Sequence, residues 1–181
     1  MRGESTCPRY LTQDFWSVHN HIELSSRLVA GCDYSVFKAG IKPMWEDKAN
    51  MNGGRWLINL DKKHRMNCLD NFWLEVLLCL IGLTSSSHFT FRVIIKSFTH
   101  SAGESFGEDG NIVNGAVVSV RNRGDKIGIW LGNAKMASSI MHVGKELKAR
   151  LGLTPTITLG FEAHEDTMHK SGSTAKSKFV V

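Results

Sequence analysis

The stretch IKPMWEDKANMNGGRWLINL, residues 41–60, guides the interpretation of the whole chain because it begins as a loop and ends as a strand. Pro43 blocks a helix at its start and favours an extended conformation in the residue before it. The pair Gly53-Gly54 indicates a turn. Arg55 to Leu60 is then predicted to form a strand.

The loop in this stretch carries a large aromatic residue, Trp45, next to an acidic one, Glu46. A flat ring beside a carboxylate suits a flat, cationic ligand that also offers N–H donors. The alternative is that Trp45 covers the core from a loop. The stretch by itself leaves both interpretations open.

Composition indicates one globular domain, residues 1–181, with 42% hydrophobic and 22% charged residues. No apolar run reaches the ~18 residues of a membrane span, and the first ten residues have no apolar signal core. The net charge of +5 is compatible with a phosphate-bearing partner. No metal site or cofactor is expected, because the four cysteines lack CxxC spacing. They are Cys7, Cys32, Cys68 and Cys79, predicted to be reduced thiols of a cytoplasmic protein, with a nuclear pool also compatible.

A first helix is predicted from Thr12 to about Leu24, followed by a short strand from Asp33 to Lys38. Trp16 lies about 100° from the centre of the helix's core stripe. A tryptophan at such a margin is usually half-buried, but it is also a common anchor for a partner. The core stripe itself consists of Phe15, Val18, His19 and Ile22.

A second helix, LDNFWLEVLLCLIG, is predicted to begin at Asn67 with Asp70 in its first turn. It is apolar all round, so both of its sides must be buried. Leu74 and Leu78 point away from the expected core side, and Glu75 lies beside them. This outer side is predicted to be either a partner surface or a second core layer.

The segment GAVVSVRNRGDKIGIWL, Gly115 to Leu131, predicts a β-hairpin with a four-residue loop. If Arg121 pairs with Lys126 across the loop, these two cations share one face with Trp130, and the aliphatic residues form the other face. Two like charges opposite each other are unfavourable unless an anion joins them, and phosphate suits that role. A solvated hairpin tip is the alternative.

A third helix is predicted from Ala134 to Leu151, and a strand from Thr156 to Phe161. The polar segment 164–178 is expected to be a flexible loop that could close over an anion, for instance through Lys170. Together these elements predict an α+β fold with helices on one face of an antiparallel sheet. The other face is predicted to hold a slot for a cationic base that carries phosphates, formed by Trp45, Glu46, Arg121, Lys126 and Trp130.

Four blocks resemble eukaryotic translation initiation factor 4E, the family that binds the mRNA cap. The resemblance covers most of the chain from about Thr12 to Val181. It implies a curved antiparallel sheet with about three helices on its convex face and the cap slot on its concave face. The blocks are KPMWEDKANMNGGRWLINL (42–60), LDNFWLEVLLCLIG (69–82), GAVVSVRNRGDKIGIW (115–130) and HKSGSTAKSKFVV (169–181).

The resemblance also implies residue roles. Trp45 would stack on 7-methylguanine, Glu46 would accept hydrogen bonds from the guanine edge, and Trp130 would contact the N7-methyl group. Methylation at N7 makes the base cationic, which strengthens both stacking on indole and attraction to a carboxylate. The cap phosphates would be held by Arg121, Lys126, Arg55 and Lys170.

For partners, the resemblance implies capped mRNA, the scaffold initiation factor 4G and 4E-binding repressor proteins. Ser173 matches the family's phosphorylation site, where a phosphate would add negative charge close to the cap phosphates. The residues that match the scaffold-binding and repressor-binding surface are Trp16, Leu74, Glu75 and Leu78.

The chain departs from the family in two places. The family's upstream strands, with the second tryptophan of its cap sandwich, have no counterpart here, which predicts an unpaired sheet edge. Losing one stacking face costs roughly 1–3 kcal/mol. Residues 83–103 interrupt a family motif and are predicted to be an inserted loop.

Three functions were compared. The first is a cap-binding translation initiation factor, which recruits capped mRNA to the ribosome through a scaffold partner. The alternative is a truncated isoform with weak cap binding that competes for partners and so regulates translation. An enzyme is not expected: His142 and Glu146 share a helical face, but no nucleophile motif, phosphate loop or metal spacing accompanies them.

Overall fold

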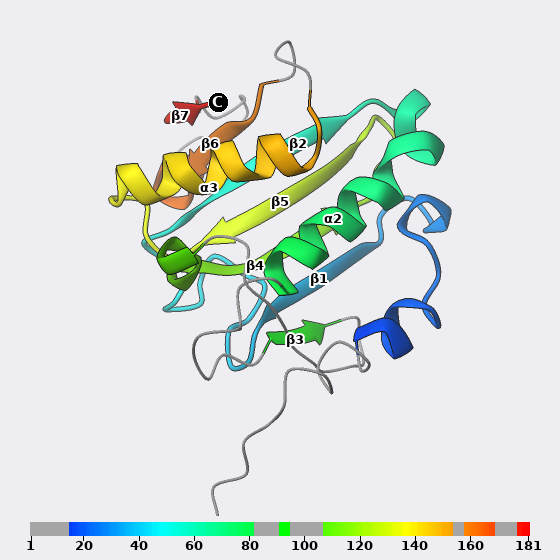
Figure 1. Cartoon of the computed structure of the whole chain (residues 1–181), viewed down its shortest axis with the longest axis horizontal. Coiled ribbons are helices and arrows are strands. Elements are labelled where there is room, and N and C mark those ends of the chain that lie inside the picture. The colour runs from blue at the N-terminus through cyan, green and yellow to red at the C-terminus, as the bar shows by residue number, and fades with distance from the viewer. Residues whose placement is uncertain (1–14, 82–90, 95–106, 154–157, 169–176) are drawn as a thin grey trace, which may run out of the picture.

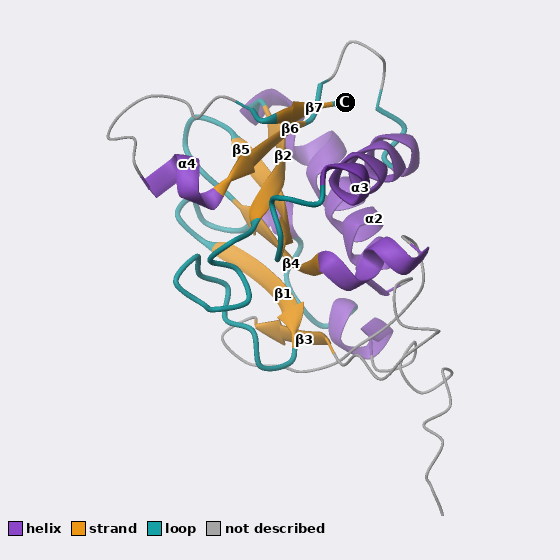
Figure 2. Ribbon diagram, turned by 90° about the vertical axis from the view of Figure 1, so that its left-hand side faces the viewer, coloured by secondary structure: helices purple, strands orange, loops and turns teal. Residues whose placement is uncertain are grey.

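The computed structural model describes residues 15–81, 91–94, 107–153, 158–168 and 177–181. Seven strands form one antiparallel sheet in the order β3-β1-β4-β5-β2-β6-β7. The helices α2 and α3 lie together on one face, and α4 lies on the other side (Figures 1 and 2). The elements are β1 (Asp33–Lys38), β2 (Gly54–Leu60), β3 (Phe91–Ile94), β4 (Val113–Ser119), β5 (Asp125–Leu131), β6 (Gly160–Ala163), β7 (Phe179–Val180), α2 (Asp70–Ile81), α3 (Ala137–Arg150) and α4 (His164–Met168).

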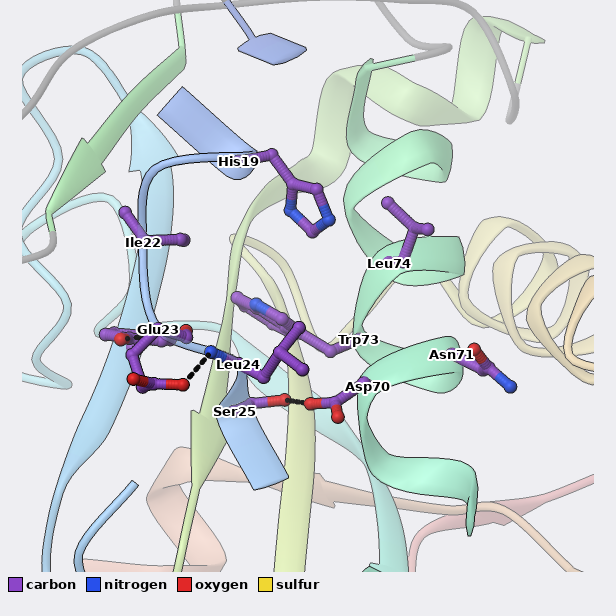
Figure 3. Close-up of a pocket in the computed structure, with 10 residues that line it drawn as sticks. His19, Ile22, Glu23, Leu24, Ser25, Asp70, Asn71, Trp73 and Leu74 are labelled. Atoms are coloured by element: carbon purple, nitrogen blue, oxygen red, sulfur yellow. Dashed lines mark hydrogen bonds between the residues drawn. The ribbon is translucent and has the colours of Figure 1, made fainter. Parts of the chain in front are cut away.

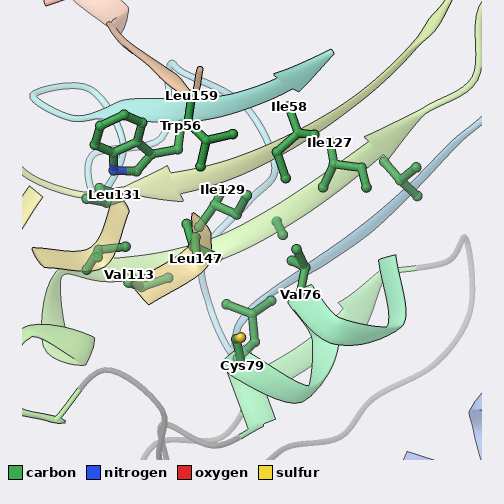
Figure 4. Packing of buried hydrophobic residues seen from close by; sticks show 14 of the residues in the cluster. Trp56, Ile58, Val76, Cys79, Val113, Ile127, Ile129, Leu131, Leu147 and Leu159 are labelled. Atoms are coloured by element: carbon green, nitrogen blue, oxygen red, sulfur yellow. The ribbon is translucent and has the colours of Figure 1, made fainter. Parts of the chain in front are cut away.

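The core lies between the sheet and the two long helices. Period-two alternation along β4 and β5 directs one set of aliphatic side chains toward α2 and α3, as predicted (Figure 4). Their complete burial stabilises the sheet–helix contact by about 1.5–3 kcal/mol for each large side chain. The six residues of this set, each 0% exposed, are Ala116, Val118, Val120, Ile127, Ile129 and Leu131.

Trp56 on β2 is the centre of the contact with α3. Its indole N–H donates to the Ile140 carbonyl over 3.1 Å, and its ring is 0% exposed. Gly144 on α3 lets the helix approach this ring, because a Cβ there would lie 2.4 Å from Trp56 Cζ2. The helix therefore needs a residue without a side chain at this position.

Gly144→Ala is expected to lower the free energy of unfolding by about 1–3 kcal/mol, although alanine favours a helix, because the added methyl group overpacks the core. Urea denaturation measures the change. Ser138→Ala, an exposed position of the same helix, is the control and should leave stability nearly unchanged. Equal midpoints for the two variants would contradict the close helix–sheet contact.

The second helix begins later than predicted. A π-helical turn, η3 (Arg65–Leu69), precedes α2, so Asn67 is not the cap. The inner side of α2 is buried as expected, with Trp73 and Val76 nearly inaccessible. On the outer side, Leu74 and Leu78 are only partly buried.

The first helix is shorter than predicted. Among the described residues, 15–19 are helical and the chain then turns, so the expected continuation to Leu24 is wrong. A 3-10 helix, η1 (Ser25–Arg27), follows. Its Ser25 hydroxyl donates to the Asp70 carboxylate over 2.6 Å, and the amide of Ser26 does so over 2.8 Å. These hydrogen bonds to the first residue of α2 replace the backbone hydrogen bonds that a longer first helix would make.

The strand β3 lies within residues 83–103, which were predicted to be an inserted loop. It pairs antiparallel with β1, with Val36 opposite Val93. On this side of the sheet the edge is therefore formed by β3 and not by β1. The rest of 83–103 lies outside the described residues.

The C-terminal part also differs from the prediction. The strand β6 begins at Gly160, later than expected, and residues 156–157 lie outside the described part of the chain. The helix α4 occupies the start of the segment that was predicted to be a flexible loop. In the part of the chain that the structure describes, no helix has the length and apolar character needed to cross a membrane.

Candidate functional site

The loop between β1 and β2 presents Trp45 to solvent. The Trp45 side chain is 45% exposed and Glu46 is also exposed. Trp45 therefore does not cover the core, which removes the alternative considered for it. A partly exposed indole beside a free carboxylate offers both stacking and hydrogen-bond acceptance to a ligand.

Asp47 shapes this loop from within. Its carboxylate accepts hydrogen bonds from the amides of Lys42 and Ala49, each over 2.9 Å. These bonds favour the ionised form and hold the pKa of Asp47 below its usual value, with the Lys42 amide contributing most. These two hydrogen bonds hold the loop backbone on either side of Trp45 and Glu46.

Asn50 joins the same loop to the sheet. It is 0% exposed, and its amide donates to the carbonyls of Lys42 and Met44 over 2.8 and 3.0 Å. Asn114 on β4 in turn donates to the Asn50 side-chain oxygen over 2.9 Å. Satisfied buried amides of this kind favour a single loop conformation.

The strand β5 carries Trp130 on the face opposite α2 and α3. In the register of β2 and β5, Trp130 lies opposite Arg55 and Lys126 lies opposite Asn59. The loop described above joins the same end of the sheet, where a Cβ on Gly53 would lie 1.9 Å from the carbonyl oxygen of Leu131. The loop that carries Trp45 and the part of β5 that carries Trp130 thus lie at the same end of the sheet.

Trp130 is held between two rings. Its centroid lies 5.6 Å from that of Phe37 and 4.5 Å from that of His164. His164 is 4% exposed, and burial, with a smaller effect from the charge of Arg55, lowers its pKa to about 4. The imidazole is therefore neutral at pH 7 and adds no positive charge behind Trp130. His164 was not predicted to belong to this site.

Arg55 on β2 makes a weak ion pair. Its guanidinium lies 3.4 Å from the Glu162 carboxylate of β6. About a third of the Arg55 side chain remains exposed, at 33%. The group therefore keeps donors available for an anion.

Arg121 and Lys126 do not face each other as predicted. Ser119 lies opposite Lys126, and Arg121 belongs to the turn. The pairing is shifted by two residues, an even number, so the predicted faces are unchanged. The prediction that Arg121 faces Lys126 is wrong, and Arg121 instead pairs with Asp33 over 2.7 Å. Both side chains of that pair are exposed, at 44% and 41%, and Lys126 is also exposed.

A buried ion pair supports the turn that carries Arg121. Asp125 has a side chain that is 0% exposed, and Arg65 of η3 donates to both of its oxygens over 2.7 Å. Arg65 also donates to the Arg121 carbonyl over 2.7 Å, and the Arg121 amide donates to Asp125 over 3.1 Å. The backbone of Arg121 is thereby fixed from two sides. Neither Arg65 nor Asp125 was predicted.

The outer side of α2 forms a second candidate surface. Trp16 is 38% exposed, and Leu74, Glu75 and Leu78 are each partly buried. A pocket of about 140 Å³ opens beside it, between α2 and residues 19–25 (Figure 3). The second core layer considered for this helix side is not found in the described residues.

Two predicted site residues, Lys170 and Ser173, lie outside the described residues. Within the described ranges, no group of His, Cys, Asp or Glu side chains could hold a metal ion.

Comparison with known proteins is consistent with this arrangement. A sequence model of the family described as "Eukaryotic initiation factor 4E" matches residues 11–179. "Eukaryotic translation initiation factor 4E" from Homo sapiens is 50% identical over 169 residues, which are 93% of this chain and 68% of the human protein. The Xenopus laevis protein of the same name is 49% identical, over 93% and 70%.

Solved structures are also similar. Ascaris suum eIF4E-3 with an m7G cap has a TM-score of 0.76 and 38% identity, over 93% of this chain and 79% of that one. Schistosome eIF4E complexed with m7GpppA and 4E-BP has a TM-score of 0.73 and 31% identity, over 93% and 80%. The C. elegans complex of eIF4E-3 with the 4E-binding protein Mextli and a cap analog has a TM-score of 0.74 and 36% identity, over 93% and 80%.

Proposed function

Because this chain belongs to the eukaryotic initiation factor 4E family, we propose that it is a translation initiation factor that binds the 7-methylguanosine cap of mRNA. Residues 1–181 are taken as one cap-binding domain. The observation that carries the proposal is the exposure of Trp45, at 45%, on a loop whose shape is fixed by other residues. The fold does not need this indole on the surface, whereas a stacking ligand does.

The base would be held by three side chains. Trp45 stacks on the methylated purine, Glu46 accepts hydrogen bonds from its N–H edge, and Trp130 contacts the methyl group. The positive charge of the base strengthens the first two contacts. The neutral His164 behind Trp130 supports this assignment, since a charged imidazole there would repel a cationic base.

The cap phosphates would run from Arg55, which lies opposite Trp130, toward Arg121 and Lys126 at the other end of the sheet. Arg121 is fixed through its backbone and through Asp33, and Lys126 extends from β5 as an exposed point charge. Arg55 contributes the donors that Glu162 leaves free. Lys170 is proposed to approach from the C-terminal segment, where Ser173 would be a phosphorylation site.

The outer surface of α2 is proposed to bind protein partners, namely the scaffold factor 4G and 4E-binding repressors. Its aromatic anchor is Trp16, and its apolar floor is Leu74 with Leu78. Glu75 would pair with a donor of the partner. A chain that only competes for partners is not favoured, because the cap residues expected on the described loop and strands are present, although the second stacking tryptophan has no counterpart.

The activity proposed is binding and not catalysis, and its place is the cytoplasm. Titration of tryptophan fluorescence with 7-methyl-GTP tests the proposal, with GTP as the matched control. Cation–π stacking predicts that the methylated nucleotide binds about 2- to 30-fold more tightly from this contact alone. Equal affinities for both nucleotides, in a chain shown to be folded by circular dichroism, would overturn cap binding.

A further inference from the structure

A second group of basic side chains lies beyond the residues proposed to hold the cap phosphates. The segment after β2 carries Lys62 and Lys63 in a 3-10 helix, η2 (Lys62–His64), where both are exposed. The β4–β5 turn carries Arg123, which is also exposed. We call Lys62, Lys63 and Arg123 the basic extension. The cap site described above uses none of them.

The two segments that carry the basic extension are held against each other. Arg65 donates from the first segment to the Arg121 carbonyl in the turn, over 2.7 Å. A Cβ on Gly124 would lie 2.9 Å from the Leu60 carbonyl oxygen, so the turn also packs directly on the end of β2. Figure 1 shows both segments together at one end of the sheet. The basic extension is therefore continuous with the end of the sheet that carries Arg121.

The charges at this end of the sheet do not cancel. Asp125 is buried against Arg65, and Asp33 is paired with Arg121. Asp61 lies 3.4 Å from Lys63, but both of these side chains are about 70% exposed and therefore screened by solvent. Within residues 61–65 and 121–126 and their partner Asp33, three carboxylates thus oppose six cationic side chains, which leaves an excess of three positive charges. The cations are Lys62, Lys63, Arg65, Arg121, Arg123 and Lys126.

We propose that the basic extension binds the backbone phosphates of the nucleotides that follow the cap in a single-stranded RNA. The proposal rests on the proposed function, because the cap phosphates at Arg121 and Lys126 fix where that RNA begins. Exposed lysines act as flexible point charges, which suits phosphates and does not select a base sequence. The contact therefore adds affinity for any capped RNA over the free cap.

The test compares two triple variants with the unmodified chain. The first is Lys62→Ala with Lys63→Ala and Arg123→Ala. The matched control is Lys145→Ala with Lys148→Ala and Arg150→Ala, which removes three charges from α3 on the helical face. Affinities for 7-methyl-GTP, for capped and uncapped RNA of about ten nucleotides and for phosphatidylserine vesicles are measured at several KCl concentrations.

The unmodified chain is expected to bind capped RNA more tightly than 7-methyl-GTP. The first variant should lose about 10- to 100-fold of its affinity for capped RNA at low salt, and its log–log salt slope should become shallower by about 2, since each phosphate contact on a single strand contributes about 0.7. Its affinity for 7-methyl-GTP should stay unchanged. The control should retain both the affinity and the slope.

Three results would overturn the proposal. In the first, the basic-extension variant keeps the salt slope of the unmodified chain. In the second, both variants lose equal affinity for capped RNA. In the third, the basic-extension variant loses only its binding to phosphatidylserine vesicles, which would indicate an anionic membrane partner. Failure of the unmodified chain to bind 7-methyl-GTP would count against the cap site instead. The uncapped RNA would still decide whether the basic extension binds phosphates.

Discussion

Replacing Trp45 with alanine is expected to weaken binding of 7-methyl-GTP by about 5- to 150-fold, because one base–aromatic stack contributes roughly 1–3 kcal/mol. The effect should be almost entirely on binding. Trp45 is 45% exposed, and the hydrogen bonds of Asp47 and Asn50 hold its loop without it. Isothermal titration calorimetry measures the change without depending on the fluorescence of the residue that is removed.

Trp45→Phe is the matched control, since it keeps an aromatic face of smaller area. It should lose less affinity than the alanine variant. The thermal midpoint of both variants should stay within a few degrees of the original, as expected for a surface change. If Trp45→Ala binds the methylated nucleotide as tightly as the unmodified chain, the base does not stack on this ring.

The largest effect on stability is expected from Arg65→Met. Removing one partner of a buried ion pair leaves an uncompensated charge, at a cost of about 3–5 kcal/mol. Here that charge is on Asp125, whose side chain is 0% exposed and would lose both guanidinium donors. Denaturant unfolding monitored by circular dichroism should show the loss as a lower midpoint.

Arg27→Ala provides the comparison for that experiment. Arg27 pairs with Glu23 over 3.8 Å at 65% and 55% exposure, so its loss should cost at most about 1 kcal/mol. Adding Asp125→Leu to Arg65→Met should restore part of the stability, because the unpaired carboxylate is then absent. Similar costs for Arg65→Met and Arg27→Ala would show that the buried pair adds nothing beyond a surface pair.

Regular patterns within a few residues of each other were predicted well from the sequence. The alternation along 115–131 identified the core face of the hairpin, and an error of two residues in its register left both faces correct because the strand period is two. The third helix likewise formed where it was predicted, and Ile140, Val143 and Leu147 are buried along one side of it at helical spacing. Local periodicity determined these features, so the sequence alone was sufficient.

Contacts between distant parts of the chain were not predicted. The first helix ends early because Ser25 and Ser26 bind Asp70, 44–45 residues away. The pairing of β3 with β1 and the stacking of His164 on Trp130 are also long-range, and no spacing in the sequence reports them. Arg121 was predicted as a basic residue of the site, but its ion pair with Asp33 was not, because that pair also joins distant parts of the chain.

In the β1–β2 loop, the residues that shape the backbone are different from the residues exposed to a ligand, and this has an evolutionary consequence. Asp47 and Asn50 determine the path of the backbone, whereas Trp45 and Glu46 are exposed to solvent. Mutations at the two exposed positions are therefore nearly free of folding cost, so selection can change the ligand without first compensating the scaffold. Mutations at Asp47 or Asn50 would change the conformation of the loop, so selection would remove them whichever ligand is favoured.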